Sequence, residues 1–326
     1  MISPLSRLGW IVWLGAFSAA AYAQQQGLDA LQWLHRIQQA AQRLNYSGTF
    51  VYLRQGGQPQ TSRLTHVYEG GAERERLEVL DGAQLIVERH NDQIKQYLPE
   101  TRSVVLEKRG PRGGFPGLLT EQVSGIAEQY EVRKHDVQRV AGMDCQVISL
   151  EPRDGMRYSH RLWADLGSGL LLKAQTLNEK GAVVEQIGFS QVEIGGGPER
   201  FAARLSKRIG GRDWKVTTPA ISEARLAEAG WKIENPMPGF RKVLELRRGI
   251  GDVQVGQVVF SDGLASVSVF VEPLRGDDKA GEGLSSEGAV NVYRRRIADH
   301  LVTVLGEAPP ACVTRIARAV EFRPRP

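Results

Sequence analysis

The stretch Thr49-Phe50-Val51-Tyr52-Leu53 decides the fold, because it opens a long series of segments in which β-forming residues alternate or cluster. Arg63-Leu64-Thr65-His66-Val67-Tyr68 and Glu75-Arg76-Leu77-Glu78-Val79-Leu80 follow it, and Asp81-Gly82 marks a tight turn after them. Further segments of this kind lie at 103–108, 130–137, 140–150, 158–164, 170–177 and 183–194. The pattern predicts a meander of antiparallel strands.

One amphipathic helix precedes this meander, since apolar residues recur there every three or four positions. They are Leu28, Leu31, Leu34, Ile37, Ala41 and Leu44. A second, short helix is expected at 120–129, after a loop rich in Gly and Pro at 110–117. So few helices cannot cover both faces of a flat sheet of about ten strands. We therefore expect the sheet to curl into an open barrel with the helices across it.

A second domain begins beyond a basic connector. Residues 199–218 hold six basic and two acidic side chains and little periodicity, so we place a linker there, between a large domain at 24–198 and a small one at 219–326. The small domain contains the hairpin signature Ser261-Asp262-Gly263. Its strands are expected at 243–248, 253–260, 264–271, 290–296 and 301–305, its polar loop at 276–286 and its helix at 311–320. The predicted fold class is mainly β, with an α+β second domain.

The first 23 residues predict an exported protein. Arg7 precedes an apolar run at 8–21 that ends in Ala21-Tyr22-Ala23, the pattern of a secretory signal peptide cleaved after Ala23. A membrane anchor is the alternative, but the run is shorter than the roughly 20 residues that a spanning helix needs. The mature protein is therefore expected to be soluble and to lie outside the cytoplasm. Its modest net charge, +5 for the full chain, and the absence of a basic domain face argue against a nucleic-acid partner.

The two cysteines, Cys145 and Cys312, fall in different predicted domains. In an oxidising compartment they could form a disulfide that clamps the domains together. Two separate buried thiols explain the count equally well.

Catalytic signatures are missing. The chain has no G-x-S-x-G, G-x-x-x-x-G-K, H-E-x-x-H or C-x-x-C motif, and its six histidines lack the spacing of metal ligands. We expect a binding protein without catalytic residues, metal or cofactor.

The connector itself allows two interpretations. It can be a solvated linker, or a site where Arg208, Arg212, Trp214 and Lys215 meet an acidic peptide or anionic lipid headgroups. Composition alone leaves both open.

An ordered set of segments resembles the RseB/MucB family of periplasmic negative regulators of the envelope-stress sigma factor. The segments lie along both domains and cover nearly the whole mature chain: 75–82, 140–152, 157–165, 169–172, 185–189, 238–240, 261–270, 288–293 and 303–307. The resemblance implies a first domain similar to LolA/LolB-type lipoprotein carriers. It also implies a partner, the periplasmic segment of a single-span anti-sigma factor of the RseA/MucA type, which the protein would shield from proteolysis. Lipopolysaccharide or lipoprotein acyl chains would release it.

Candidate contact residues are aromatic and cationic side chains near the connector and in the second domain. Those for the partner are Arg208, Arg212, Trp214, Lys215, Trp231, Phe240, Phe260, Phe270 and Tyr293. Those for a lipid pocket are Leu31, Leu34, Phe50, Tyr52 and Phe115. The alternatives to a peptide-binding regulator are a lipid or lipoprotein carrier and a periplasmic hydrolase, and a homo-oligomer is compatible with each.

Overall fold

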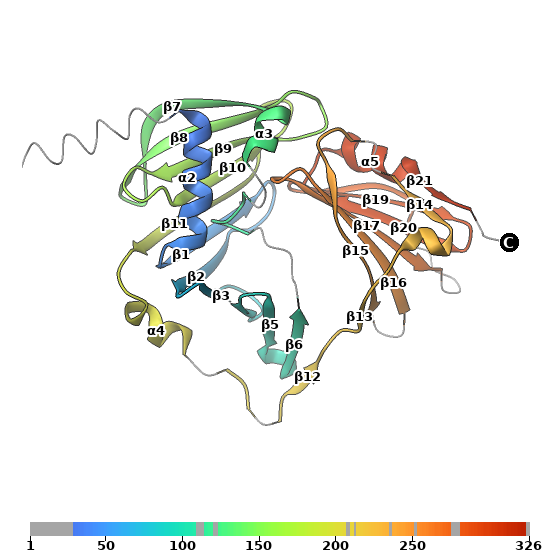
Figure 1. Ribbon diagram of the computed structural model, residues 1–326, viewed down its shortest axis with the longest axis horizontal. Coiled ribbons are helices and arrows are strands. Elements are labelled where there is room, and N and C mark those ends of the chain that lie inside the picture. The colour runs from blue at the N-terminus through green and yellow to red at the C-terminus, as the bar shows by residue number, and fades with distance from the viewer. Residues whose placement is uncertain are drawn as a thin grey trace, which may run out of the picture.

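The computed structural model describes residues 29–108, 114–119, 123–206, 209–211, 213–234, 237–250, 253–274 and 281–323. The expected signal peptide at 1–23 and the candidates Arg208 and Arg212 lie outside these ranges. Two β-rich bodies stand side by side, with the connector running below the first before it enters the second (Figure 1).

Helix α2, Ala30–Arg43, lies where the apolar periodicity predicts it. It begins with a capping box: the backbone N–H of Gln32 donates to Asp29 Oδ1 (2.7 Å), and the backbone N–H of Asp29 donates to Gln32 Oε1 (2.9 Å). Its buried face carries Trp33, Leu34 and Ile37. The helix runs across one face of the large sheet (Figure 1).

The large sheet has twelve strands in the order β12-β6-β5-β4-β3-β2-β1-β11-β10-β9-β8-β7. All neighbours are antiparallel except β12 and β6. The strands are β1 Tyr46–Arg54, β2 Gln60–Glu69, β3 Ala72–Val79, β4 Ile86–His90, β5 Gln93–Leu98, β6 Ser103–Lys108, β7 Tyr130–Val140, β8 Met143–Pro152, β9 Ser159–Asp165, β10 Leu171–Leu177, β11 Val183–Ile194 and β12 Lys215–Thr217. Because β12 and β7 do not pair, the sheet is an open shell.

The core of the first domain fills the side of this shell that faces α2. Trp33 and Leu34 pack there with Phe50 and Phe189 from the two central strands. Helix α3, Val123–Gln129, adds Ile126, and a short 3-10 helix, Pro99–Thr101, connects β5 to β6. Helices on one side of a curled antiparallel sheet are the arrangement that the sequence predicts.

The β7–β8 hairpin corrects one predicted boundary. The sequence places a strand at 140–150, whereas the chain turns at Ala141 and Gly142, both with positive φ (49° and 83°). Two successive residues of positive φ make the mirror-image turn whose twist matches antiparallel strands. Ala141 is an unusual residue for that conformation, which is why local pattern missed the turn.

The second domain is a seven-stranded antiparallel sheet with order β13-β15-β16-β17-β20-β19-β18, and helix α5, Pro310–Ala319, packs on one face. Its strands are β13 Ile221–Glu223, β15 Arg241–Ile250, β16 Val253–Ser261, β17 Ser266–Pro273, β18 Gly283–Glu287, β19 Val290–Ile297 and β20 His300–Gly306. A 3-10 helix, Leu226–Ala229, and the small pair β14 Trp231–Ile233 and β21 Val320–Phe322 complete the domain.

The predicted fold class is confirmed: the chain is mainly β, with an open first sheet and a smaller α+β domain. Two segments expected to be irregular are ordered. Strand β18 occupies part of the predicted loop at 276–286, where it gains its hydrogen bonds from β19. Helix α4, Glu199–Leu205, and strand β12 lie within the predicted linker. The polar sequence of β18 gives no signal for a strand, and β12 pairs with β6, which is distant in sequence.

The β7–β8 turn gives a matched pair of substitutions. Ala141→Gly should stabilise the domain by about 1 kcal/mol because glycine adopts positive φ without cost, and Gly142→Ala should destabilise it by a similar amount. No atom lies within 4 Å of a Cβ built on Gly142, so the second effect is conformational. Urea unfolding of both variants measures this, and equal free energies for the two would contradict it.

Candidate functional site

The junction between the domains centres on a buried ion pair. Arg157, in the loop before β9, donates from Nε to Asp262 Oδ2 at 2.7 Å, and both side chains have 0% of their surface exposed. Arg157 also donates to Asp154 and to the backbone carbonyl of Pro238. Its guanidinium lies 4.9 Å from the ring centroid of Phe240. One side chain of the first domain is thus held by four groups, three of which belong to the second domain.

Asp262 is positioned by the turn in which it lies. Its Oδ1 accepts backbone N–H groups of Leu264 (3.0 Å) and Ala265 (2.8 Å) in the β16–β17 hairpin. Oδ2 is left for Arg157 and for the Tyr130 hydroxyl at 3.4 Å. Burial lowers the pKa of Arg157, but the hydrogen bond and charge of Asp262 outweigh it and the net pKa is raised. The arginine therefore stays charged at the junction.

A second contact lies at the β18–β19 turn. Tyr158 and Val184 of the first domain pack with Ala289 of the second. Asn291 donates from Nδ2 to the Tyr158 hydroxyl (2.8 Å) and to the carbonyl of Ala308 (2.8 Å). An exposed ion pair, Arg54 Nη1 to Glu287 Oε1 at 2.5 Å, closes the rim. Met156 of the first domain also packs against the core of the second, and Leu264 of the second packs against the core of the first. The junction therefore combines polar contacts with a small number of apolar ones.

A titrating carboxyl stands beside this contact. Burial, together with the charge of Glu307 from the second domain, raises the pKa of Glu185 to about 7, against the effect of its hydrogen bond with Tyr52. Glu185 lies opposite Arg54 on β1 and Thr176 on β10. Near neutral pH the carboxyl of Glu185, close to that of Glu307 in the opposite domain, is therefore only partly protonated.

The connector is attached to the edge of the large sheet. Strand β12 pairs in parallel with β6, and the backbone N–H of Lys215 donates to the carbonyl of Arg102 (2.9 Å). Trp214 packs edge-on against Tyr97 with ring centroids 6.4 Å apart, and Arg102 Nη1 lies 3.3 Å from Asp213 Oδ2. The described part of the connector is therefore a strand docked on the sheet edge and not a fully solvated linker. The other interpretation, a site for an acidic peptide or anionic lipid headgroups, stays a prediction.

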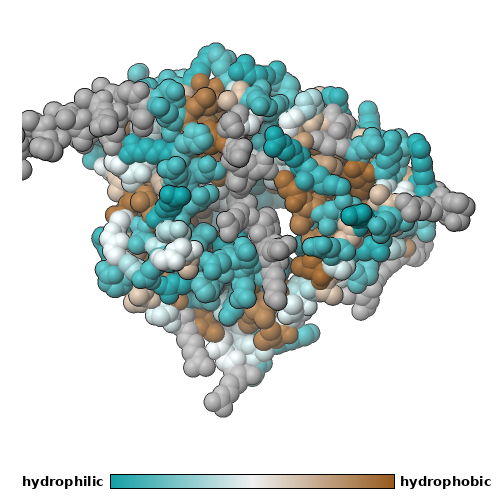
Figure 2. Space-filling view, in the orientation of Figure 1, coloured by the Kyte–Doolittle hydropathy of each residue, from teal (hydrophilic) through white to brown (hydrophobic). Residues whose placement is uncertain are grey.

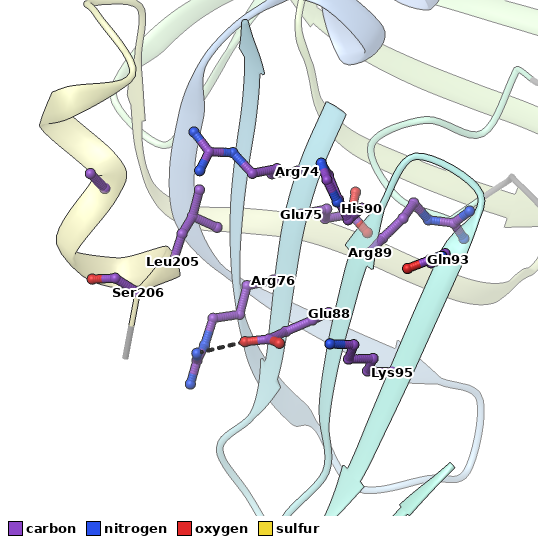
Figure 3. A pocket seen from close by; sticks show the side chains of 11 residues that line it. Arg74, Glu75, Arg76, Glu88, Arg89, His90, Gln93, Lys95, Leu205 and Ser206 are labelled. Carbon is purple, nitrogen blue, oxygen red and sulfur yellow. Dashed lines mark hydrogen bonds and ion pairs between the residues drawn. The ribbon is translucent and has the colours of Figure 1, made fainter. Parts of the chain in front are cut away.

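A cavity of about 280 Å³ lies beside this connector, between strands β3 to β5 and the end of α4. Arg76, only 2% exposed, pairs there with Glu78 (2.6 Å) and Glu88 (3.0 Å). Figure 3 shows Arg74, His90 and Lys95 around the same space, with Leu205 and Ser206 on the α4 side. Three exposed cationic or titratable side chains and a polar wall suit an anionic group better than an acyl chain.

The aromatic candidates for partner contact are mostly core residues. Trp231, Phe240 and Phe260 are buried in the second domain, so they cannot meet a partner in this fold. Phe270, Tyr293 and Trp214 are half-buried, and Lys215 is exposed. The sequence proposed all of them for contact with the partner, and for the half-buried and exposed ones that role stays a prediction.

Three of the five candidates for a lipid pocket come together in the first core, where the rings of Phe50 and Phe115 have centroids 5.5 Å apart. Leu34, Phe50 and Phe115 are buried in the first core, and Tyr52 is half-buried near the junction. Leu31 is 38% exposed on the outer side of α2. The junction residues Arg157 and Asp262 were missed as site residues. Asp262 lies in a recognisable turn, but no local pattern marks Arg157.

The two cysteines are free thiols in separate cores. Cys145 packs in the first domain and Cys312 in the second, and burial raises the pKa of each to about 12. The structure therefore contains no clamp between them, and the alternative of two buried thiols describes them.

The described residues hold no group of three or more His, Cys, Asp or Glu side chains that could bind a metal ion. Within the same ranges, no helix is both long and apolar enough to span a membrane.

The junction pair predicts a large loss on truncation. Arg157→Met leaves Asp262 buried without its cation, and we expect about 3–5 kcal/mol of destabilisation in urea unfolding. Arg133→Met is the matched control, because its ion pair with Glu131 is exposed and should contribute under about 1 kcal/mol. Equal losses in the two variants would refute the assignment.

Glu185 predicts a pH dependence. Its pKa is raised in the fold, so the native state binds more protons than the unfolded chain, and the stability gained by protonation is lost as pH rises through about 7. The pKa of His160, lowered by burial to about 4, contributes below that range. Between pH 6 and 8, wild type should lose roughly 1–2 kcal/mol relative to Glu185→Gln. Parallel urea-unfolding profiles for the two proteins would contradict this.

Each of the two domains matches its own family model among known proteins. Residues 29–216 match the family model of the MucB/RseB N-terminal domain, and residues 225–321 match that of the MucB/RseB C-terminal domain. The sigma factor AlgU regulatory protein MucB of Pseudomonas aeruginosa is 31% identical over 93% of this chain and 94% of its own. The sigma-E factor regulatory protein RseB of Haemophilus influenzae is 24% identical over 93% and 95%.

Solved structures agree with these relatives over both domains. A structure of MucB in complex with MucA(peri) has a TM-score of 0.68 and 32% identity, and covers 91% of this chain and 100% of that one. A structure of the Pseudomonas aeruginosa MucA/MucB complex has a TM-score of 0.70 and 31% identity, and covers 91% and 99%. With both of its domains matched, the chain belongs to the MucB/RseB family.

Proposed function

We propose that this protein is a periplasmic regulator that binds the periplasmic segment of a MucA/RseA-type anti-sigma factor and so restrains the envelope-stress sigma factor. The observation that carries the proposal is the likeness, across both domains, to MucB in complex with MucA(peri). The names of the relatives, regulatory proteins of AlgU and sigma-E, support the same role.

Binding without catalysis is consistent with the chemistry of the described residues. Two of their groups with a raised pKa, Tyr130 and Arg157, both donate a hydrogen bond to Asp262 at the junction. A protein that covers a protease-sensitive segment needs surface and orientation rather than a nucleophile. A lipid or lipoprotein carrier is not favoured, because the relatives that match both domains are named as regulators.

Release by lipopolysaccharide or lipoprotein acyl chains belongs to the same proposal. A ligand that prefers another arrangement of the two domains would weaken partner binding, and the partner would weaken ligand binding by the same factor. The apolar side chains at the junction are few: Tyr158 and Val184 pack with Ala289. Met156 packs against the core of the second domain and Leu264 against the core of the first. We propose that the two domains change their arrangement at a small apolar cost.

The test is isothermal titration of residues 24–326 with the periplasmic segment of the anti-sigma factor from the same organism. We expect saturable binding with 1:1 stoichiometry and slower proteolysis of the segment in the complex. Lipopolysaccharide should then weaken the binding. The proposal is overturned if about 100 μM of the segment gives no heat of binding and no protection from proteolysis. The binding free energy would then be weaker than about −5.5 kcal/mol, too weak to hold a regulator in place.

A further inference from the structure

The connector is attached to both domains within a short stretch of chain. Strand β12 pairs in parallel with β6 of the first domain and ends at Thr217. Just beyond it, the carbonyl of Ala220 accepts the backbone N–H of Gly249 in the second domain (3.0 Å), and β13 follows, paired with β15. Figure 1 shows the chain passing straight from β12 to β13. The two attachments are therefore joined by Thr218 and Pro219 alone.

This link is short and stiff. An extended chain rises at most about 3.6 Å per residue, so the three peptide units from Thr217 to Ala220 reach no more than about 11 Å. Pro219 has a fixed φ angle and also holds the residue before it in an extended conformation. While β12 stays on β6, the β13 edge of the second sheet can turn about this link but cannot move away from the first domain.

The docking of β12 buries little surface. All its residues are exposed, and Val216 is 60% exposed. Figure 2 shows hydrophobic residues open to solvent at the lower end of the first domain, where β12 docks. The ion pair of Arg102 with Asp213 has 72% and 65% of its side chains exposed, so water and salt weaken it. Within the described chain, the strand is held mainly by its backbone pairing and by the contact of Trp214 with Tyr97.

The segments on either side of β12 are anchored more firmly. Helix α4 buries Phe201 completely and packs against β2 and β3. The 3-10 helix after β13 buries Leu226 in the core of the second domain, and the backbone N–H of Leu226 donates to Glu245 Oε1 (2.7 Å). Segments with little burial open at a lower free-energy cost than the elements around them. We therefore expect β12 to open while its neighbours stay in place.

Two attachments hold the domains at separate places. The first is the pair of Arg157 and Asp262, which lies beside α3, because Tyr130 directly follows this helix and donates to Asp262. The second is the docking of β12. In Figure 1, α3 lies at the upper end of the first domain and β12 at the lower end. Two separated attachments fix an orientation, whereas one alone leaves a pivot.

We propose that residues 213–217, called here the strap, form a releasable attachment that controls how far the two domains can open. With the strap docked on β6, both attachments are closed and the domains keep one orientation. With the strap released, the link between the domains runs from Leu205, at the end of α4, to Ala220, and it can reach roughly 50 Å. The second domain then turns about the pair of Arg157 and Asp262. The proposal concerns the free protein and does not depend on the proposed function.

A pair of proline substitutions tests the strap. Lys215→Pro removes the backbone N–H that donates to the carbonyl of Arg102, so it should release the strand. Val216→Pro is the matched control. N–H groups alternate in direction along a strand and β12 is the edge of its sheet, so the N–H of Val216 points away from β6. Lys215→Gln is a second control, which removes only the charge.

Pulsed electron–electron spin resonance measures the effect, with labels on cysteines at Val137 in the first domain and Gln254 in the second. Both side chains are exposed, and the native thiols are buried. We expect a broader distance distribution for the Lys215→Pro protein, and the wild-type width for Val216→Pro and Lys215→Gln. Equal distributions in all four proteins would overturn the proposal. Equal broadening by both prolines would also overturn it, because the effect would then not come from the pairing with β6.

A disulfide across the strap supplies the opposite test. Val105 and Thr217 are partners in the register of β6 and β12, and paired strands lie about 4.8 Å apart, within the Cα–Cα range of disulfides. The Val105→Cys/Thr217→Cys protein is compared in its oxidised and reduced forms, with Arg157→Met added to open the other attachment.

Small-angle X-ray scattering should give a larger radius of gyration for the reduced form of this protein than for the oxidised form. Equal radii would contradict the proposal, because the strap would then not limit the opening of the domains. The proline variants keep Arg157, so they test the strap independently if the Arg157→Met protein does not fold.

Discussion

The buried pair of Arg157 and Asp262 is the constraint on which the arrangement of the molecule depends. Two charges without exposed surface lose their hydration on folding, and their mutual attraction offsets that loss only when the geometry is good. The geometry here is supplied from three sides, by the β16–β17 turn, the Tyr130 hydroxyl and the Pro238 carbonyl. Such a pair adds less to stability than to specificity, because another packed orientation of the two domains would separate each charge from its partner.

A junction of this kind suits a protein whose grip must be released. The apolar part of the contact consists of Tyr158, Val184 and Ala289, with Met156 and Leu264 each against the core of the opposite domain. This is far less than a domain core. The rest is hydrogen bonds and ion pairs that water can replace once the domains separate. Glu185 makes the stability of this contact depend on pH, because its carboxyl lies near that of Glu307 in the other domain. In the function proposed above, holding and releasing the partner correspond to two arrangements of this junction.

Sequence pattern predicted most of the fold, because a period of two in the strands and of about 3.6 in α2 is a local property. It missed the turn at Ala141, since a non-glycine residue there gives no signal for positive φ. It also missed β12, whose three residues gain strand geometry only by pairing with β6, more than a hundred positions earlier.

The site residues were harder to predict from the sequence than the fold. Trp231 and Phe260 were chosen for their type, yet aromatic residues are as useful inside a core as on a surface. Arg157 has no local mark, since its partner Asp262 is distant in the chain.

The central claim is that one buried polar joint holds both domains in a single binding unit. Pulsed electron–electron spin resonance tests it most directly, with labels on cysteines at Val137 and Leu284, which are 47% and 48% exposed in different domains. The account predicts one narrow distance distribution for wild type, broadened when Arg157 is replaced by Met. A distribution that is already broad in wild type, or unchanged by the loss of Arg157, would contradict it.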